Sequence, residues 1–138
     1  MALLLSLVRR WWRVPRSWAS FRPFSLPVIA LRVGGTIVRA LVDTGAAQSL
    51  IDSRLVEQLG LQLEGTVRIV GVGTKPRSVP LISLEGAAIG RCRLSSFKAG
   101  VMDLANLGIG IQLILGIDAF HGYRLQFDLA KGKLYLLS

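Results

Sequence analysis

Closely spaced glycines are the feature that most constrains the fold of this chain. There are 15 glycines among 138 residues, and from Gly34 onward they divide the sequence into short apolar segments. Glycine destabilises the interior of a helix and suits tight turns, whereas the segments between these glycines are long enough for strands. The sequence therefore predicts a mainly β protein with at most one or two short helices.

The strand signals are short apolar runs bounded by turn residues. We expect residues 28–33 and 36–42 to form a hairpin across Gly34 and Gly35, and residues 124–129 and 133–137 to form another near the C-terminus. Ser49 or Asp52 could begin a short helix that Gly60 ends, and residues 116–123 suggest a second short helix. Further strands are expected at residues 66–72, 79–84, 87–97, 98–102 and 111–115. This succession predicts a β-barrel or a β-sandwich.

Residues 1–26 differ in composition from the rest of the chain. They contain five arginines and three tryptophans but no acidic residue. The apolar run at residues 2–8 is too short to span a bilayer, and the arginines follow it instead of preceding it as in a secretory signal. Two interpretations stay open: a disordered leader, or a segment in peripheral contact with a membrane. We place the folded domain at residues 27–138, in a protein that is cytoplasmic or membrane-associated through this segment.

Composition makes several kinds of site improbable. Cys92 and His121 are the single residues of their types, so the sequence offers no disulfide framework and no cysteine cluster for a metal. We expect no metal and no cofactor. The net charge is +9, but aromatic residues are not interleaved with basic ones after residue 26, so a nucleic-acid-binding β-barrel is the least favoured function. Cys92 itself is interpreted as a small apolar filler rather than a reactive thiol.

One carboxylate stands in an unusual place. Asp43 follows an apolar run and leads directly into Thr44, Gly45 and Ala46. An acid at the end of a buried strand is costly unless it is hydrogen-bonded, neutralised or used in chemistry. Gly45 permits a tight turn and brings backbone N–H groups near the carboxylate, and Thr44 can hold the loop rigid. An isolated Asp-Thr-Gly is usually an ordinary turn, so the surrounding sequence decides its meaning.

The surrounding sequence resembles the retropepsin-like aspartic peptidases, the single-lobe family that includes the retroviral proteases. Asp-Thr-Gly-Ala is followed by Ser49-Leu50-Ile51 and, about 70 residues later, by Leu113-Ile114-Leu115-Gly116. The resemblance covers residues 27–137 and implies a closed β-barrel lobe with one or two short helices. It also implies that Asp43 is catalytic, that Thr44, Gly45 and Ala46 support the active-site loop, and that Leu115 and Gly116 form a second core motif beside it.

The function implied by this resemblance is that of a homodimeric aspartic endopeptidase acting on a polypeptide. Two carboxylates that share one proton can activate a water molecule and hydrogen-bond the scissile carbonyl. The chain has one Asp-Thr-Gly, so the second carboxylate would be Asp43 of a two-fold-related copy. The alternative is a non-catalytic dimerisation or peptide-binding module of the same fold. The intact Asp-Thr-Gly-Ala favours the peptidase.

The glycine-rich stretch at residues 70–75 is expected to form the tip of a hairpin that covers bound substrate. Its flap residues would be Gly71, Val72 and Gly73, since the stretch lies between Asp43 and the second apolar motif, as the family pattern requires. The simpler alternative is a plain surface hairpin.

Two positions depart from the viral pattern. Viral members often carry an acid two positions after the glycine of Asp-Thr-Gly and an arginine directly after the glycine of the second motif, and these two residues form an ion pair. The corresponding residues here are Ala47 and Ile117, so both charges are missing together and no buried charge is orphaned. The dimer would then rest on apolar packing, on Asp118 with a partner such as Arg124, or on concentration at a membrane.

Asp118 is otherwise expected to have a structural role near the start of the second helix. His121 is interpreted as a helix residue or a hydrogen-bonding residue at an interface. A hydrolase triad of Ser49, His121 and an aspartate lacks the sequence motif that would support it.

Overall fold

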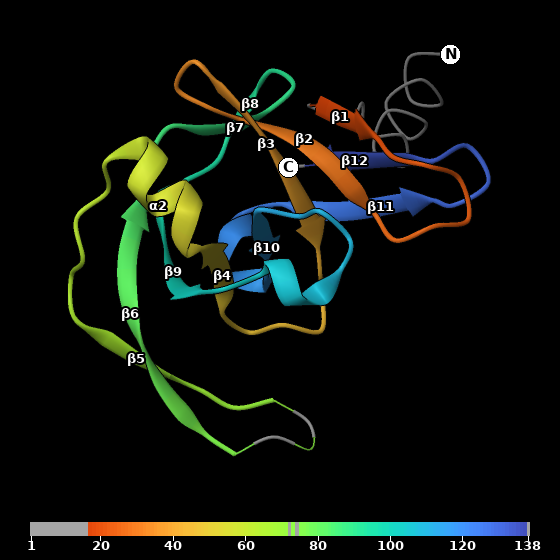
Figure 1. The fold of residues 1–138 in the computed structure, drawn as a ribbon. Helices are drawn as coiled ribbons and strands as arrows, with labels where there is room; N and C mark the ends of the chain where they lie inside the picture. The colour runs from red at the N-terminus through yellow and green to blue at the C-terminus, as the bar shows by residue number, and fades with distance from the viewer. Residues whose placement is uncertain (1–16, 72, 74, 138) are drawn as a thin grey trace, which may run out of the picture.

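The computed structural model describes residues 17–71, 73 and 75–137, and Figure 1 shows one long hairpin projecting away from the other strands. The chain order of the elements is β1 (Ser17–Ser20), β2 (Val28–Val33), β3 (Thr36–Val42), β4 (Ser49–Asp52), α2 (Ser53–Leu59), β5 (Thr66–Ile69), β6 (Arg77–Leu84), β7 (Ala87–Ile89), β8 (Cys92–Arg93), β9 (Phe97–Met102), η1 (Ala105–Leu107), β10 (Leu113–Leu115), η2 (Ile117–Phe120), β11 (Arg124–Asp128) and β12 (Lys133–Leu137). The prediction of a mainly β fold is confirmed.

The strands form two sheets. The larger has nine strands in the order β5-β6-β9-β4-β10-β3-β2-β7-β8, and the smaller has three in the order β1-β12-β11. The strands do not close into the expected barrel, because β5 and β8 are unpaired edges of the larger sheet among the described residues. The physical reason is visible in Figure 1, where β5 and the adjoining half of β6 extend away from the body instead of turning back toward β8.

The two expected hairpins are confirmed. Strand β2 pairs antiparallel with β3, with Val33 opposite Thr36 across the two glycines, and β11 pairs antiparallel with β12. The segment expected as strand at residues 87–97, with Gly90 at a turn or bulge, is divided there into β7 and β8, because Gly90 turns the chain with a positive φ of 55°, and Phe97 already begins β9. The strand expected at residues 66–72 is shorter, since β5 ends at Ile69.

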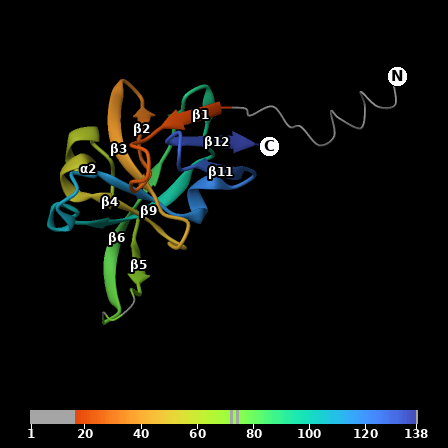
Figure 2. The same cartoon turned by 90° about the vertical axis from the view of Figure 1, so that its right-hand side faces the viewer.

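The fold begins before the boundary expected at residue 27. Strand β1 pairs antiparallel with β12, and Phe21 belongs to the main apolar core. Ser17 is buried, and its hydroxyl donates to the carbonyl of Ile89 at 2.7 Å. Figure 2 shows β1 lying along β12 at one end of the body. The described fold therefore reaches back to Ser17, while the interpretations of residues 1–16 lie outside the described residues.

The described part of the expected leader also shows how its aromatic residues are used. The Lys133 ammonium lies 3.7 Å from the centroid of the Trp18 ring, so this tryptophan contributes to the contact between β1 and β12. Within residues 17–71, 73 and 75–137, the helices are all too short or too polar to cross a membrane.

Apolar side chains pack on both faces of β10. Leu113 and Leu115 are fully buried in the main core, which also contains Leu134 and Leu136 of the smaller sheet. Ile114 points to the opposite face because side chains alternate along a strand. There it joins a smaller apolar cluster, which we call the second cluster. Its members are Leu104, Ile111 and Ile114, with Val28, Leu41, Leu50 and Met102 packed against them.

Candidate active site

The loop that carries Asp43 is anchored to the end of β10. The Asp43 backbone N–H donates to the carbonyl of Leu115 at 2.9 Å, and the Ala46 N–H donates to the carbonyl of Asp43 at 3.1 Å. These bonds close a tight turn directly after β3. The backbone under Asp43 is therefore held by the strand that the second sequence motif forms.

The carboxylate of Asp43 is oriented but not saturated. The Gly45 N–H donates to its Oδ1 at 3.0 Å, while no described residue donates to Oδ2. A Cβ at residue 45 would lie 3.2 Å from the same Oδ1, so a side chain there would crowd the carboxylate. Asp43 is partly buried. The loop thus presents one carboxylate oxygen that is available to an outside partner.

Strand β10 is inserted between the strands on either side of this loop. It pairs in parallel with β3, placing Leu115 beside Val42, and antiparallel with β4, placing Ile114 beside Leu50. The expected proximity of the two apolar motifs is therefore present, although almost 70 residues separate them in the sequence. A strand with paired neighbours on both sides and buried side chains gives the loop a rigid base.

Gly116 is required by the close approach of two backbones. A Cβ on this residue would lie 2.5 Å from the carbonyl oxygen of Ala46 and 2.9 Å from Oδ1 of Asp118, closer than real Cβ contacts allow. The next residue, Ile117, donates its N–H to the same Ala46 carbonyl at 2.9 Å. Gly116 therefore lets the segment after β10 close over the Asp43 loop.

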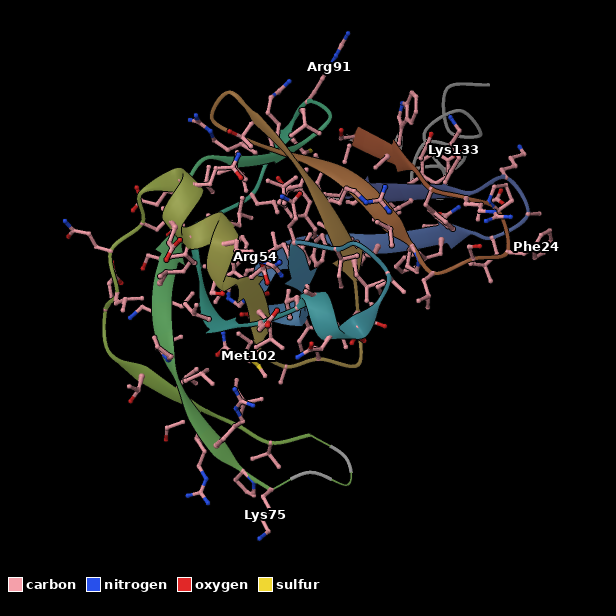
Figure 3. All side chains as sticks on the ribbon, viewed as in Figure 1. Phe24, Arg54, Lys75, Arg91, Met102 and Lys133 are labelled. Carbon is pink, nitrogen blue, oxygen red and sulfur yellow. The ribbon has the colours of Figure 1, made fainter. Side chains whose placement is uncertain are left out.

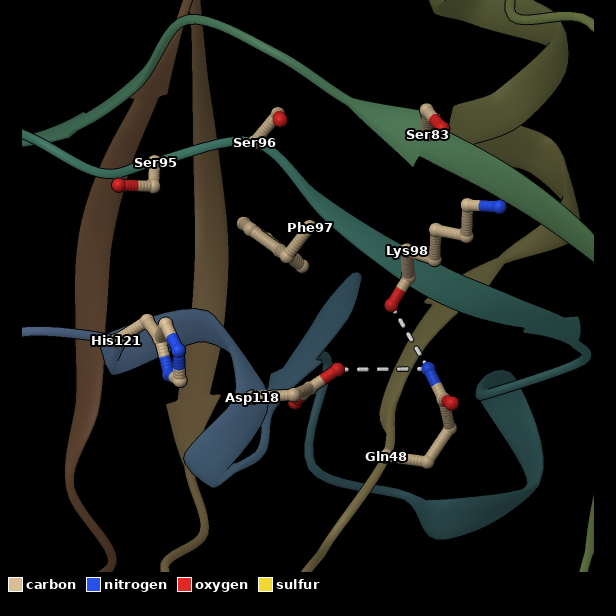
Figure 4. Close-up of a pocket in the computed structure, with 8 residues that line it drawn as sticks. All are labelled: Gln48, Ser83, Ser95, Ser96, Phe97, Lys98, Asp118 and His121. Carbon is tan, nitrogen blue, oxygen red and sulfur yellow. Dashed lines mark hydrogen bonds between the residues drawn. The ribbon is translucent and has the colours of Figure 1, made fainter.

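Asp118 completes this connection with hydrogen bonds. Its carboxylate accepts from the Ser49 hydroxyl at 2.7 Å and from the Ser49 N–H at 3.1 Å, and the Gln48 amide lies 3.4 Å away. The Ser49 hydroxyl also accepts from the Gly116 N–H at 3.0 Å. The carboxylate points toward Gln48 in Figure 4. Asp118 thus has the expected structural role, but through Ser49 rather than by capping η2.

These contacts also bear on two roles considered in the sequence analysis, that of Ser49 as a hydrolase nucleophile and that of Asp118 as a partner of Arg124. Ser49 is fully buried with its hydroxyl bonded to Asp118 and Gly116, so it cannot serve as a hydrolase nucleophile. Asp118 is held within its own chain by Ser49 and Gln48, and the described residues show no contact between it and Arg124.

A hollow of about 480 Å³ lies on the outer side of this hydrogen-bond network. Asp118, Gln48, Lys98 and His121 contribute to its wall, and the Gln48 amide spans it by donating to the Lys98 carbonyl at 2.7 Å (Figure 4). His121 directly follows η2 and is exposed. Cys92, in contrast, is buried in the main core, which agrees with its interpretation as an apolar filler.

The expected flap is the hairpin of β5 and β6. These strands pair from Thr66–Pro80 to Ile69–Arg77, and Figure 3 shows Lys75 at the far end of the projection. Gly73 has a positive φ of 74°, as a turn at the tip requires. Of the three expected flap residues, Gly71 and Gly73 are described, whereas Val72 lies outside the described residues.

Gly100 of β9 leaves room for side chains of the hairpin and of β4. A Cβ on Gly100 would lie 3.0 Å from Val79 Cγ2, 3.2 Å from Leu50 Cδ2 and 3.4 Å from Ile69 Cδ1. Two hairpin side chains and Leu50, which follows the Asp43 loop by a few residues, therefore border the same space above Gly100.

A second aspartate beside β10 has a different environment. Asp52 is 5% exposed and accepts hydrogen bonds from the Leu104 N–H at 2.8 Å and from Arg54 Nε at 3.0 Å. It is also the N-cap of α2, as one of the two sequence alternatives predicted, and Gly60 ends this helix. Burial raises the pKa of the Asp52 carboxyl, but the hydrogen bonds from Arg54 and Leu104 and the charge of Arg54 outweigh it, leaving the pKa below its ordinary value.

The described residues contain no group of three or more histidine, cysteine or acidic side chains placed to hold a metal ion. The functional group that the Asp43 loop presents is the Asp43 carboxylate.

Comparisons with known proteins agree with this geometry. Residues 29–119 match a family model described as aspartyl protease. DNA damage-inducible protein 1 of Chaetomium globosum is 28% identical over 113 residues, which cover 78% of this chain but 24% of that relative. The chain thus corresponds to about a quarter of the length of this curated relative.

Two solved structures share the fold. A retropepsin-like aspartic protease from Rickettsia conorii matches with a TM-score of 0.58 and 20% identity, over 86% of this chain and 87% of the other. The retroviral protease-like domain of Ddi1 from Leishmania major matches with a TM-score of 0.52 and 19% identity, over 82% and 93%. The prediction of a retropepsin-like fold is confirmed.

Proposed function

Because the chain belongs to the aspartyl protease family, we propose that it is an aspartic endopeptidase in which the Asp43 carboxylates of two copies act together. The observation that carries this proposal is the state of Asp43. Its Oδ1 is oriented by the Gly45 N–H, its Oδ2 has no donor among the described residues, and its backbone is bonded to Leu115. Thr44, Gly45 and Ala46 would support this loop, with Leu115 and Gly116 beneath it.

The chemistry needs two carboxylates that share one proton. The ionised carboxylate accepts a proton from water while the water oxygen bonds to the carbonyl carbon of the substrate. The protonated carboxylate gives its proton to the carbonyl oxygen. The proton taken from water then passes to the departing amine as the C–N bond breaks, while the carboxylate that gave up its proton takes one back from a hydroxyl of the tetrahedral intermediate, which restores the singly protonated pair. Like charges about 3 Å apart cannot both ionise, so the pair itself favours the singly protonated state.

The second carboxylate must come from a second copy, since the chain contains one Asp-Thr-Gly. A two-fold axis between the two Asp43 loops would bring their neighbouring residues into contact. Ile117 is 56% exposed, although its backbone is bonded to Ala46 in this loop, and Ala47 is exposed as well. We propose that apolar contact at these two positions replaces the ion pair of the viral relatives. Dimerisation should then be insensitive to salt.

The substrate would be an extended polypeptide bound between the two copies, under the hairpins of β5 and β6. The flap role of Gly71, Val72 and Gly73 is part of this proposal. It is supported by the projection of the hairpin and by the position of its Val79 and Ile69 side chains around Gly100, where Leu50 also lies.

Cleavage of a denatured polypeptide by the purified full chain, from acidic to neutral pH, tests the proposal. We expect cleavage that Asp43→Asn and a transition-state mimic of aspartic proteases both abolish. Asp128→Asn is the matched control, because Asp128 makes a turn hydrogen bond with the Lys131 N–H far from the site, which an amide oxygen can also accept.

Sedimentation in low and high salt establishes whether the tested preparation is dimeric. A dimeric preparation that cleaves nothing across this pH range would overturn the peptidase proposal and favour the non-catalytic binding module. Cleavage that survives Asp43→Asn would overturn the assigned role of Asp43.

A further inference from the structure

A hollow of about 520 Å³ beside β2 and β3 contains two arginines that the proposed reaction does not use. Arg22 and Arg39 line it together with Ser25, and Leu26, Val28 and Ile109 supply apolar walls. We call this the arginine pocket. The two arginines are brought together by the tertiary structure, since Arg22 precedes β2 and Arg39 lies in β3.

Arg39 is held in place but retains donors. Its backbone N–H donates to the side chain of Gln112 at 3.0 Å, its carbonyl accepts from the Gln112 N–H at 2.9 Å, and its Nε donates to the carbonyl of Gly110 at 3.1 Å. No described residue accepts from its two terminal guanidinium nitrogens. One edge of the guanidinium is therefore positioned by the chain and the other is open to a ligand.

Arg22 lies in a turn that is fixed at both ends. The Phe21 N–H donates to the carbonyl of Gly132 at 2.9 Å, the Phe24 N–H donates to that of Leu129 at 3.1 Å, and the Arg22 carbonyl accepts from the Ser25 N–H at 3.2 Å. The wall that carries Arg22 is thus attached to the turn between β11 and β12. The fold therefore fixes the backbone of this wall.

No described residue neutralises the charge of the pocket. The ion pairs among residues 17–71, 73 and 75–137 all belong to Arg54, with Asp52 and Asp103, and no carboxylate of these residues lies within 4 Å of either pocket arginine. Two guanidinium groups beside apolar walls suit a ligand with a carboxylate on a short aliphatic stem. An aspartate or glutamate side chain has this chemistry.

The arginine pocket borders the strand that leads to Asp43. Val28 lines the pocket and also packs on the second cluster, and it lies opposite Leu41, two residues before Asp43. The Val42 N–H donates to the carbonyl of Pro27 at 3.0 Å, so the pocket wall borders the end of β3. Strand spacings place Val28 roughly 8 Å from Asp43.

We propose that the arginine pocket is a specificity site that binds an acidic side chain of the polypeptide substrate. This inference rests on the proposed peptidase function and adds a substrate class to it. An extended peptide advances about 3.3 Å per residue, so the acidic residue would lie about two to four positions from the scissile bond. The two-fold dimer would present one such pocket on each side of that bond.

The test uses peptides that differ only by Glu or Gln at each of the positions two, three and four residues from the cleaved bond, on either side. We expect the full chain to cleave one Glu peptide with a kcat/KM about tenfold above its Gln counterpart, with the preference decreasing as salt is added. The Arg22→Gln/Arg39→Gln double variant should cleave the two peptides equally. Arg32→Gln is the matched control, since it removes the same charge from the outer face of β2 without touching the pocket.

Two further experiments, charge reversal and a binding measurement, distinguish failure of the pocket proposal from failure of the peptidase proposal. Arg22→Glu/Arg39→Glu should favour a Lys peptide over the Glu peptide, which a merely damaged fold would not do. Binding of the same peptides to Asp43→Asn, measured by fluorescence anisotropy, reports on the pocket without catalysis. The unmodified chain could cleave no peptide while Asp43→Asn binds the Glu peptide more tightly than the Gln peptide, and adding Arg22→Gln and Arg39→Gln could abolish that preference. This result would support the pocket proposal and overturn the peptidase proposal.

Cleavage or binding that does not distinguish Glu from Gln in the unmodified chain would overturn the pocket proposal and leave the peptidase proposal intact. A preference that survives in the double variant, or that Arg32→Gln removes equally, would overturn it too.

Discussion

Asp43 and Asp52 lie at the ends of the two strands that flank β10, and their carboxylates have opposite surroundings. Asp52 is nearly inaccessible and accepts hydrogen bonds from Arg54 and from the backbone of Leu104. Asp43 is partly accessible, accepts a single bond from Gly45 and has an oxygen with no donor among the described residues. The same residue type beside the same strand therefore has two different environments.

The difference in accessibility and partners is what we expect between a structural carboxylate and the reactive carboxylate of the proposed function. A carboxylate saturated by internal donors stabilises the fold, and its removal leaves those donors unpaired. A carboxylate that is oriented but unsaturated contributes little to stability and is available to water, substrate or a second carboxylate. The strongest tests of this comparison are those that change one aspartate and measure both stability and activity.

Asp43→Asn should give the largest effect, and only on activity. We expect kcat/KM to fall at least about a thousandfold, because the amide cannot act as a general base. The free energy of unfolding should change by less than about 0.5 kcal/mol, since an amide oxygen can accept the Gly45 N–H. Chemical denaturation beside the cleavage assay measures both quantities, and a large loss of stability would break the comparison.

Asp52→Ala should show the reverse pattern. It removes the N-cap of α2 and leaves the Leu104 N–H without its buried acceptor. We expect a loss of about 2–3 kcal/mol in the free energy of unfolding. Activity per folded molecule should be retained, as measured below the denaturation midpoint with the folded fraction determined by circular dichroism. A loss of activity without a loss of stability would contradict the structural role.

Ser49→Ala tests the connection between the two regions. The variant leaves the Gly116 N–H without its acceptor and removes the 2.7 Å hydrogen bond to Asp118. We expect a loss of about 1–2 kcal/mol in stability. A smaller decrease in kcat should accompany it, because Gly116 and Ile117 hold the Ala46 end of the active-site loop. Ser83→Ala is a suitable control, since that hydroxyl bonds to Glu64 away from the loop.

The pH dependence of stability gives the smallest and most specific effect. The folded pKa of Asp52 lies below its ordinary value of 3.8, so the unfolded chain binds the proton first as the pH falls. The contribution of the charged Asp52 is therefore complete above about pH 4 and is lost as the pH falls through the lower folded pKa. The stability difference between the unmodified chain and Asp52→Asn should shrink below pH 4 in urea titrations. A difference that stays constant down to pH 2 would show that the charge has no part in it.

Local features of the sequence predicted the elements that carry the comparison. Gly34 and Gly35 indicated the first hairpin, Asp52 and Gly60 marked the ends of α2, and Asp-Thr-Gly after an apolar run indicated the Asp43 loop. Each of these depends on the backbone preference of one or two residues, or on a hydrogen bond that spans a few positions. Such preferences act wherever the segment is placed.

Features that depend on distant segments were not predictable in the same way. Periodicity did not show that β1 pairs with β12 or that the larger sheet stays open. These outcomes depend on which edges find partners, and sequence spacing does not encode that choice. Ser17 is an example, because its hydroxyl can bond to the Ile89 carbonyl only after folding has brought β1 beside the turn at Gly90.

The amino-acid sequence by itself determined the position of the unusual carboxylate, the glycines around it and the apolar strand that would lie beside it. Only the tertiary structure decided that Asp52 is the aspartate saturated with hydrogen bonds and that Asp118 accepts a hydrogen bond from Ser49. It also decided that Arg22 and Arg39 line the same pocket. The physical reason is that a turn requires particular residues at adjacent positions, whereas hydrogen-bond saturation and charge pairing depend on groups that folding brings together from across the chain.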